Sequence, residues 1–137
     1  MTQLLIFISS LFFSEPSELF YIKVNVTGFD SNAGSANIAL FNKSNGFPVY
    51  GKQIQGRVVS ISNRSCTVWF KDLSKGNYAI AVYHDENNNK KMDKNVFGAP
   101  TESYGFSNNV RPTFSAPSFD DCRFYIGQNR TINITVK

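Results

Sequence analysis

Apolar and polar side chains alternate along most of the chain with a period of two. The alternation is clearest where Ile22, Val24 and Val26 are separated by polar residues, and it recurs in several later segments. Because successive side chains of a strand point to opposite faces, each such segment predicts a strand with one buried face. The predicted strands are residues 20–28, 35–42, 56–61, 65–72, 77–84, 121–127 and 131–136.

The segments between these strands are rich in Gly, Asn, Asp and Ser, which favour turns, and Lys75-Gly76-Asn77 predicts a hairpin. Short antiparallel strands separated by turns predict two packed sheets, a β-sandwich. Residues 84–118 are the exception, because they have little apolar period. A connection of that length is usually functional or internally tied.

An apolar run of about ten residues, 4–13, lies near the N-terminus. It is too short to span a bilayer and is typical of a secretory signal peptide. We therefore predict a signal peptide over residues 1–18 and a single β-sandwich domain over 19–137, with a buried N-terminal strand or helix as the alternative. With no second apolar run, we expect no membrane span after cleavage and a secreted, periplasmic or cell-envelope location.

Composition narrows the function classes. With 42% hydrophobic and 18% charged residues among 137, the chain has enough apolar surface for a folded core. The formal charge is +4, but no basic run exceeds Lys90-Lys91, so we expect no nucleic-acid partner. The two cysteines, Cys66 and Cys122, exclude a cysteine-built zinc site. Both are predicted to face inward, which leaves a disulfide and two free thiols equally open.

The segment after the 77–84 strand, residues 85–102, is here called the acidic loop. It holds four of the eight acidic residues that follow residue 18. Its oxygen-bearing side chains alternate at the first, third, fifth and ninth positions of a twelve-residue calcium loop, whose seventh position contributes a backbone carbonyl. The predicted Ca²⁺ ligands are Asp85, Asn87, Asn89, Lys91 (carbonyl), Asp93 and, as a closing carboxylate, Glu102.

The match to a calcium loop is incomplete. Lys90 stands at the sixth position, where Gly would supply a positive φ, and Val96 stands at the twelfth, where a Glu would bind. The alternatives are an Asx-rich loop that caps its own backbone and a site for another metal. His84 would favour a transition metal, but a lone His at a strand end is more often a surface or packing residue. Downstream, three aromatic residues are expected to plug the end of the sandwich rather than to form a ligand platform: Phe97, Tyr104 and Phe106.

A series of motifs runs through the second half of the chain: Phe70–Ile80, His84–Asn89, Met92-Asp93, Gly98-Ala99-Pro100, Glu102, Tyr104–Asn108 and Ala116–Phe124. Together these motifs resemble the bacterial exported domains catalogued as domain of unknown function 2141, over about residues 20–137. Lys90 replaces a Gly usual in that family, and Ser74-Lys75 replaces a common Pro.

The hairpin Leu73-x-x-Gly76-x-Tyr78 also resembles prealbumin-like modules, including carboxypeptidase regulatory-type and surface-adhesin domains. That resemblance implies a Greek-key sandwich without implying an activity. The expected fold class is thus an all-β, antiparallel Greek-key β-sandwich of about seven strands, prealbumin-like or immunoglobulin-like, with one long ion-binding loop.

Three functions remain open. The first is a noncatalytic exported binding or structural module, monomeric and calcium-stabilised, whose partner is a protein or glycan of the cell envelope. The second is a carboxylate-dependent hydrolase using Asp85, Asp93 or Glu102, which we disfavour because the chain has one His and no serine-elbow motif. The third is a small-ligand carrier with a cavity between the sheets. We therefore expect that the protein is not an enzyme.

Overall fold

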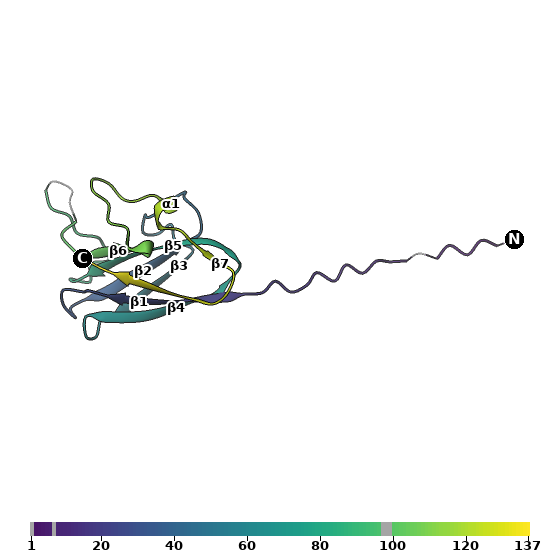
Figure 1. Cartoon of the computed structure of the whole chain (residues 1–137), viewed down its shortest axis with the longest axis horizontal. Coiled ribbons are helices and arrows are strands. Elements are labelled where there is room, and N and C mark those ends of the chain that lie inside the picture. The colour runs from purple at the N-terminus through teal and green to yellow at the C-terminus, as the bar shows by residue number, and fades with distance from the viewer. Residues whose placement is uncertain (1, 7, 97–99) are drawn as a thin grey trace.

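Two facing β-sheets form the body of the molecule in the computed structural model, which describes residues 2–6, 8–96 and 100–137 (Figure 1). The prediction of an all-β sandwich is confirmed. Its elements are β1 (Phe20–Thr27), β2 (Ser35–Phe41), β3 (Gln55–Ser60), β4 (Ser65–Leu73), β5 (Gly76–Asp85), β6 (Tyr104–Phe106), the 3₁₀ turn η1 (Ser107–Asn109), α1 (Phe119–Cys122), β7 (Phe124–Ile126) and β8 (Arg130–Thr135).

The strands are ordered β4-β1-β8 in one sheet and β3-β2-β5-β6 in the other, where β7 also pairs with β5. The alternating apolar residues predicted to face inward do so, and they form the core between the sheets. Ile22, Ile38 and Ile80 are among its fully buried members. Burial of these side chains is the main force that holds the two layers together.

One strand pair departs from the antiparallel expectation. β1 and β8 run parallel, with Ile22 opposite Arg130 and Thr27 opposite Thr135. The reason is that β7 belongs to the other sheet, so the chain crosses between sheets before β8 and enters beside β1 in the same direction.

The predicted strand 121–127 is only partly correct. Its first residues belong to α1, which Ser118 caps by accepting a hydrogen bond from the Asp121 N–H at 3.1 Å. The side-chain parity assigned to Cys122 was therefore wrong. Both thiols are free, with Cys66 against the inter-sheet core and Cys122 in a different cluster. Burial raises the pKa of Cys66 to about 11 and that of Cys122 to about 12, so both stay protonated.

A second apolar cluster covers the outer face of the β3-β2-β5-β6 sheet. It joins Phe41 and Ala79 from the strands to Phe119 and Cys122 from α1. Phe106 is buried in this cluster and Tyr104 packs against it, as expected of a plug, although they cover the outer face and not the end of the sandwich. Phe97, the third predicted plug residue, lies outside the described residues.

The described residues before β1, 2–6 and 8–19, form no helix or strand, and their side chains are exposed. Figure 1 shows this segment extending away from the sandwich. The alternative of a buried N-terminal element is therefore wrong. Among the described residues, no helix is long and apolar enough to cross a membrane.

Candidate functional site

The acidic loop leaves the sandwich at the end of β5, where Asp85 is the last strand residue and is only 1% exposed. The turn before β2 packs its backbone against this point. A Cβ atom on Gly34 would collide with the carbonyl oxygens of Asp85 and Glu86. The start of the loop is thus fixed by a backbone contact that a larger residue at position 34 would not permit.

Side chains of the loop bind its own backbone. Asp85 accepts hydrogen bonds from the N–H groups of Asn89, at 3.1 Å, and Lys90, at 2.8 Å. The Asn87 Oδ1 accepts from the Asn89 N–H at 3.2 Å, and the Asn89 Oδ1 accepts from the Lys91 N–H at 2.9 Å. This is the self-capping arrangement that the sequence left open as an alternative.

Lys90 adopts the left-handed conformation expected at the sixth position of the loop, with φ of 63°. A non-glycine residue is strained there, because its Cβ approaches the neighbouring carbonyl oxygen. The Asp85 carboxylate, which binds the Lys90 N–H, compensates for this strain.

The other end of the loop brings Asp93 and Glu102 together. The Thr101 N–H donates to the Asp93 carbonyl at 2.8 Å, and a long contact of 3.5 Å joins the Asp93 N–H to the Glu102 Oε2. The side-chain amides of Asn87 and Asn89 each donate to a different oxygen of Asp93, both at 2.7 Å. Asp93 and Glu102 thus lie side by side, while the role of Glu102 as a closing ion ligand stays a prediction.

We call Asp85, Asp93 and Glu102 the acidic cluster. Burial, a hydrogen bond to the Asp93 carboxyl and the charges of the other two acids raise the pKa of Glu102 to about 7. Hydrogen bonds from Asn89, Glu102 and Asn87 lower the pKa of Asp93. Within the described part of the chain, no Lys or Arg forms an ion pair with these three carboxylates. The charge of Lys91 helps to lower the pKa of Asp93, although the two side chains form no ion pair.

The donors of this loop are the hard oxygens that Ca²⁺ prefers, so their chemistry fits that ion. Their orientation fits less well, since Asn87 and Asn89 turn their NH₂ groups to Asp93. Within residues 2–6, 8–96 and 100–137, no three or more His, Cys, Asp or Glu side chains are grouped so that they could hold a metal. An ion there would depend on amide and carbonyl oxygens as well.

His84 is a packing residue. Its ring is 0% exposed, packs edge-on against Phe29 and places Nε2 2.6 Å from the Ala33 carbonyl oxygen. The Nε2 proton is assigned from that contact. With this nitrogen directed at Ala33, the idea that His84 favours a transition metal gains no support.

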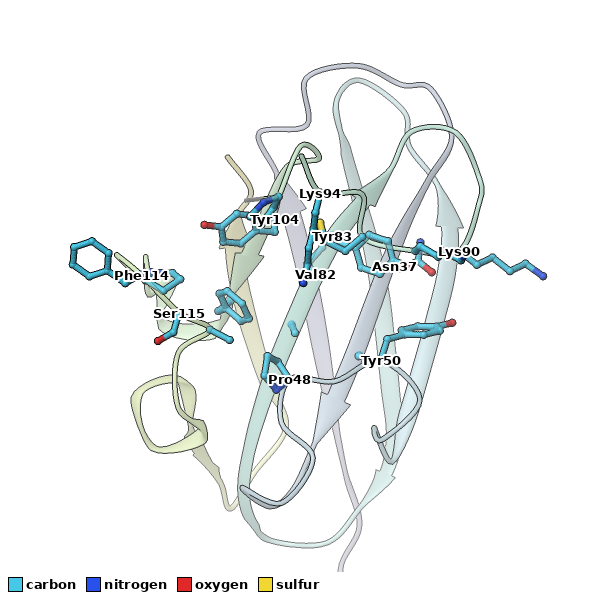
Figure 2. Close-up of a pocket in the computed structure, with 18 of the residues that line it drawn as sticks. Asn37, Pro48, Tyr50, Val82, Tyr83, Lys90, Lys94, Tyr104, Phe114 and Ser115 are labelled. Carbon is cyan, nitrogen blue, oxygen red and sulfur yellow. The ribbon is translucent and has the colours of Figure 1, made fainter. Parts of the chain in front are cut away.

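A second candidate site was missed at the sequence level. A cavity of about 800 Å³, the outer-face pocket, opens over β2, β5 and β6 (Figure 2). Asn37 and Tyr83 are among its lining residues, as are Lys90, Lys91 and Lys94 of the acidic loop. A signal was available, because β2 and β5 are apolar at most successive positions. That pattern predicts a sheet covered on both faces.

Comparison with known proteins identifies the family. Residues 24–134 match the family model described as "Uncharacterized protein conserved in bacteria (DUF2141)". Searches of curated proteins and of solved structures found no match. Since the matched region covers the whole sandwich apart from a few residues at its two ends, this chain belongs to the DUF2141 family of uncharacterised bacterial proteins.

Proposed function

We propose that this chain is a noncatalytic exported module, a prealbumin-like Greek-key sandwich whose acidic loop is stabilised by calcium. The observation that carries the proposal is the acidic cluster. Asp85 and Glu102 are 1% and 7% exposed, yet no cationic side chain in the described part of the chain pairs with them. Buried charges are normally paired or bound to a metal. A bound dication would supply the missing charge.

The residues that would hold Ca²⁺ are the three carboxylates, the Lys91 carbonyl and the amide oxygens of Asn87 and Asn89. The alternation of these groups along the loop supports the proposal, since it is the spacing by which short loops direct several oxygens at one ion. The ion would stabilise the loop and so fix its position relative to β5.

Export is the second part of the proposal, with residues 1–18 as the signal peptide. Large apolar side chains of this segment are highly exposed, including Leu5, Phe12 and Phe13 at 82%, 95% and 87%. A soluble protein rarely keeps such a surface, and cleavage would remove it. The exported domain would act as a monomer on an envelope protein or glycan. The mass of the protein recovered from outside the cytoplasm tests export with cleavage of the signal peptide, and a mass that retains residues 1–18 contradicts it.

The ion is tested by thermal unfolding with calcium, with magnesium and with chelator. Because a ligand that binds only the folded state stabilises it by about 2.7 kcal/mol at 100 times its Kd, calcium should raise Tm by several degrees. Magnesium, which keeps its water shell, should have a smaller effect. An identical Tm in all three conditions contradicts the proposal.

One observation favours the hydrolase alternative. The pKa of Glu102 is raised while that of its neighbour Asp93 is lowered, and such a split is typical of a general acid beside a base. We rank it second because both carboxyl groups are held by hydrogen bonds within the loop, Asp93 by two side-chain amides and Glu102 by the Asp93 N–H, an arrangement that serves the fold. Turnover of a substrate in a hydrolase panel, lost in Glu102→Gln, would reverse this ranking.

A further inference from the structure

The floor of the outer-face pocket is built from two rows of residues across the sheet. Asn37, Tyr83 and Tyr104 lie opposite one another on β2, β5 and β6. Ala39, Ala81 and Phe106 form the next row. The two alanines leave a depression beside larger neighbours, so the polar groups of Asn37 and Tyr83 lie next to a shallow apolar surface.

Three polar atoms of this floor have no hydrogen-bond partner within the described residues: the Asn37 Oδ1, the Asn37 Nδ2 and the Tyr83 hydroxyl. Their residues are 3% and 9% exposed. A buried polar group without a partner costs about 1–3 kcal/mol. Such a cost is explained if a bound ligand supplies the missing hydrogen-bond partners.

The unpartnered atoms specify the ligand's buried end. The Asn37 amide offers an acceptor and donors together, and burial raises the pKa of Tyr83 to about 12, so its hydroxyl stays protonated. A carboxylate can only accept hydrogen bonds, so it would leave the Asn37 Oδ1, itself an acceptor, without a partner. Hydroxyl groups both donate and accept, so adjacent hydroxyls of a sugar ring satisfy all three atoms.

The walls are aromatic and already positioned. The Tyr50 ring packs edge-on against Tyr83, with ring centroids 6.1 Å apart. The Arg111 guanidinium lies 4.5 Å from the centre of the Tyr104 ring and donates to the Tyr104 carbonyl at 2.7 Å. The Tyr50 ring, and the face of Tyr104 that Arg111 does not cover, offer apolar surface to the C–H groups of a sugar.

The mouth is cationic. Lys90, Lys91 and Lys94 line the pocket and, within the described part of the chain, form no ion pair. In Figure 2, Lys94 lies over the strands near Tyr83, whereas Lys90 extends away from the sheet. These ammonium groups favour a ligand with an anionic outer end at the mouth. At the buried end, the charges of Asp85, Glu102 and Asp93 contribute to the raised pKa of Tyr83, so the anionic group of the ligand points away from Tyr83.

We propose that the outer-face pocket binds a saccharide that carries a carboxylate, such as a uronate unit of an acidic polysaccharide. Its hydroxyls bind Asn37 and Tyr83, its ring lies against Ala39 and Ala81, and its carboxylate faces the lysines. The cavity of about 800 Å³ accommodates a short oligosaccharide and falls within the range usual for small-ligand sites. The inference does not depend on calcium in the acidic loop.

The first test is NMR titration of the chain with a trimer of galacturonic acid, with a neutral galactose trimer as comparison. Signals of the Asn37 side-chain amide should shift on titration. Because uronates chelate calcium, the titration is run both with calcium and with chelator. Absence of any shift at Asn37 in both conditions overturns the proposal, as does tighter binding of decanoate or of adenosine monophosphate than of the trimer.

Two tyrosine variants separate binding from folding. Tyr83→Phe removes a hydroxyl without a partner, so stability should be kept while affinity falls about 3- to 10-fold, the worth of one hydrogen bond. Tyr78→Phe is the matched control, because the Tyr78 hydroxyl donates to the Ser74 carbonyl at 2.6 Å, remote from the pocket. It should lower stability and leave affinity unchanged. Equal affinity of wild type and Tyr83→Phe overturns the assignment.

The lysines are tested by the double variant Lys91→Gln, Lys94→Gln. Affinity for the acidic trimer should fall about 3- to 10-fold at low salt, and binding of the neutral trimer should not change. An equal loss for both sugars would show that the lysines do not contact a carboxylate, and would overturn that part of the proposal.

Discussion

The acidic cluster and the outer-face pocket both include residues of the acidic loop, but each lacks a different kind of interaction. In the acidic cluster each carboxylate accepts hydrogen bonds, but no cation pairs with the charge in the described part of the chain. In the pocket, free lysines are present at the mouth, but Asn37 and Tyr83 lack hydrogen-bond partners among the described residues. In our two proposals, a cation supplies the charge that the first site lacks, and sugar hydroxyls supply the hydrogen-bond partners that the second site lacks.

The largest effect on stability is expected at Asp85, in the acidic cluster. Asp85→Ala removes two charge-assisted hydrogen bonds from a buried position and should lower the free energy of unfolding by about 3 kcal/mol. It should also abolish most of the calcium-induced rise in Tm. Denaturant unfolding with and without calcium measures both.

Asp120→Ala is the control for Asp85, because Asp120 is exposed and its contact with Arg123 is a surface ion pair. Its effect should stay within about 0.5 kcal/mol. A full calcium response in Asp85→Ala would separate the loop's self-capping from any ion and would contradict the calcium proposal.

Glu102 sharpens the comparison through pH. With the pKa of Glu102 raised from 4.5 to about 7, the folded protein binds more protons than the unfolded chain between these values. The free energy of unfolding should therefore fall as the pH rises through this window, and level off above it. Glu102→Gln should remove the slope, whereas Asp120→Asn should keep it. A calcium-free stability profile that is flat from pH 4.5 to 7 in the wild type would contradict this prediction.

In the pocket, the opposite sign is expected for loss of a polar group. Asn37→Leu removes an amide without partners and should raise the free energy of unfolding by about 1 kcal/mol, while it weakens saccharide binding. Asn25→Leu is the matched control on β1, because the Asn25 amide donates a hydrogen bond to the Asn133 Oδ1 and accepts one from the Thr67 hydroxyl. It should be destabilising. An equal loss of stability in both variants would show that the Asn37 amide is hydrogen-bonded in the folded protein, and would contradict this prediction.

The sequence predicted the longer strands because alternation over six or more residues is a strong signal. It missed β6 and α1, since elements of three or four residues show no period. Cys122, the last residue of α1, continues the spacing of Phe124 and Ile126 in β7, so the predicted strand began too early. The acidic loop begins at the end of β5, as the sequence predicts, because the strand before it is long enough to be recognised. The orientation of the Asn87 and Asn89 amides was not predictable, because it depends on where Asp93 folds back.

The apolar runs of β2 and β5 indicate a covered outer face, but the segments that cover it cannot be identified from local patterns. Asn37 and Tyr83 occupy outward positions of their strands, and alternation alone predicts that outward polar groups meet solvent. They are buried because distant segments cover them, among them the turn that carries Tyr50 and the acidic loop itself. Burial of this kind follows from tertiary contacts, which a pattern of two residues does not contain.

The smallest expected effect is also the one that joins the two sites. Lys90→Gly should relieve the strain of a left-handed lysine, about 1–2 kcal/mol, but it adds the backbone entropy of a glycine to the unfolded chain, about 0.5–1 kcal/mol. The net gain in the free energy of unfolding should be about 0.5–1 kcal/mol. The calcium response should persist, because the Asp85 carboxylate still accepts the backbone N–H of residue 90. Binding of the acidic trimer should weaken only slightly, because Lys90 lines the pocket but extends away from the sheet.

Lys91→Gly is the control, since Lys91 has no positive φ and the change should destabilise the loop. A loss of stability in Lys90→Gly would show that the lysine side chain contributes more through its contacts than its backbone conformation costs.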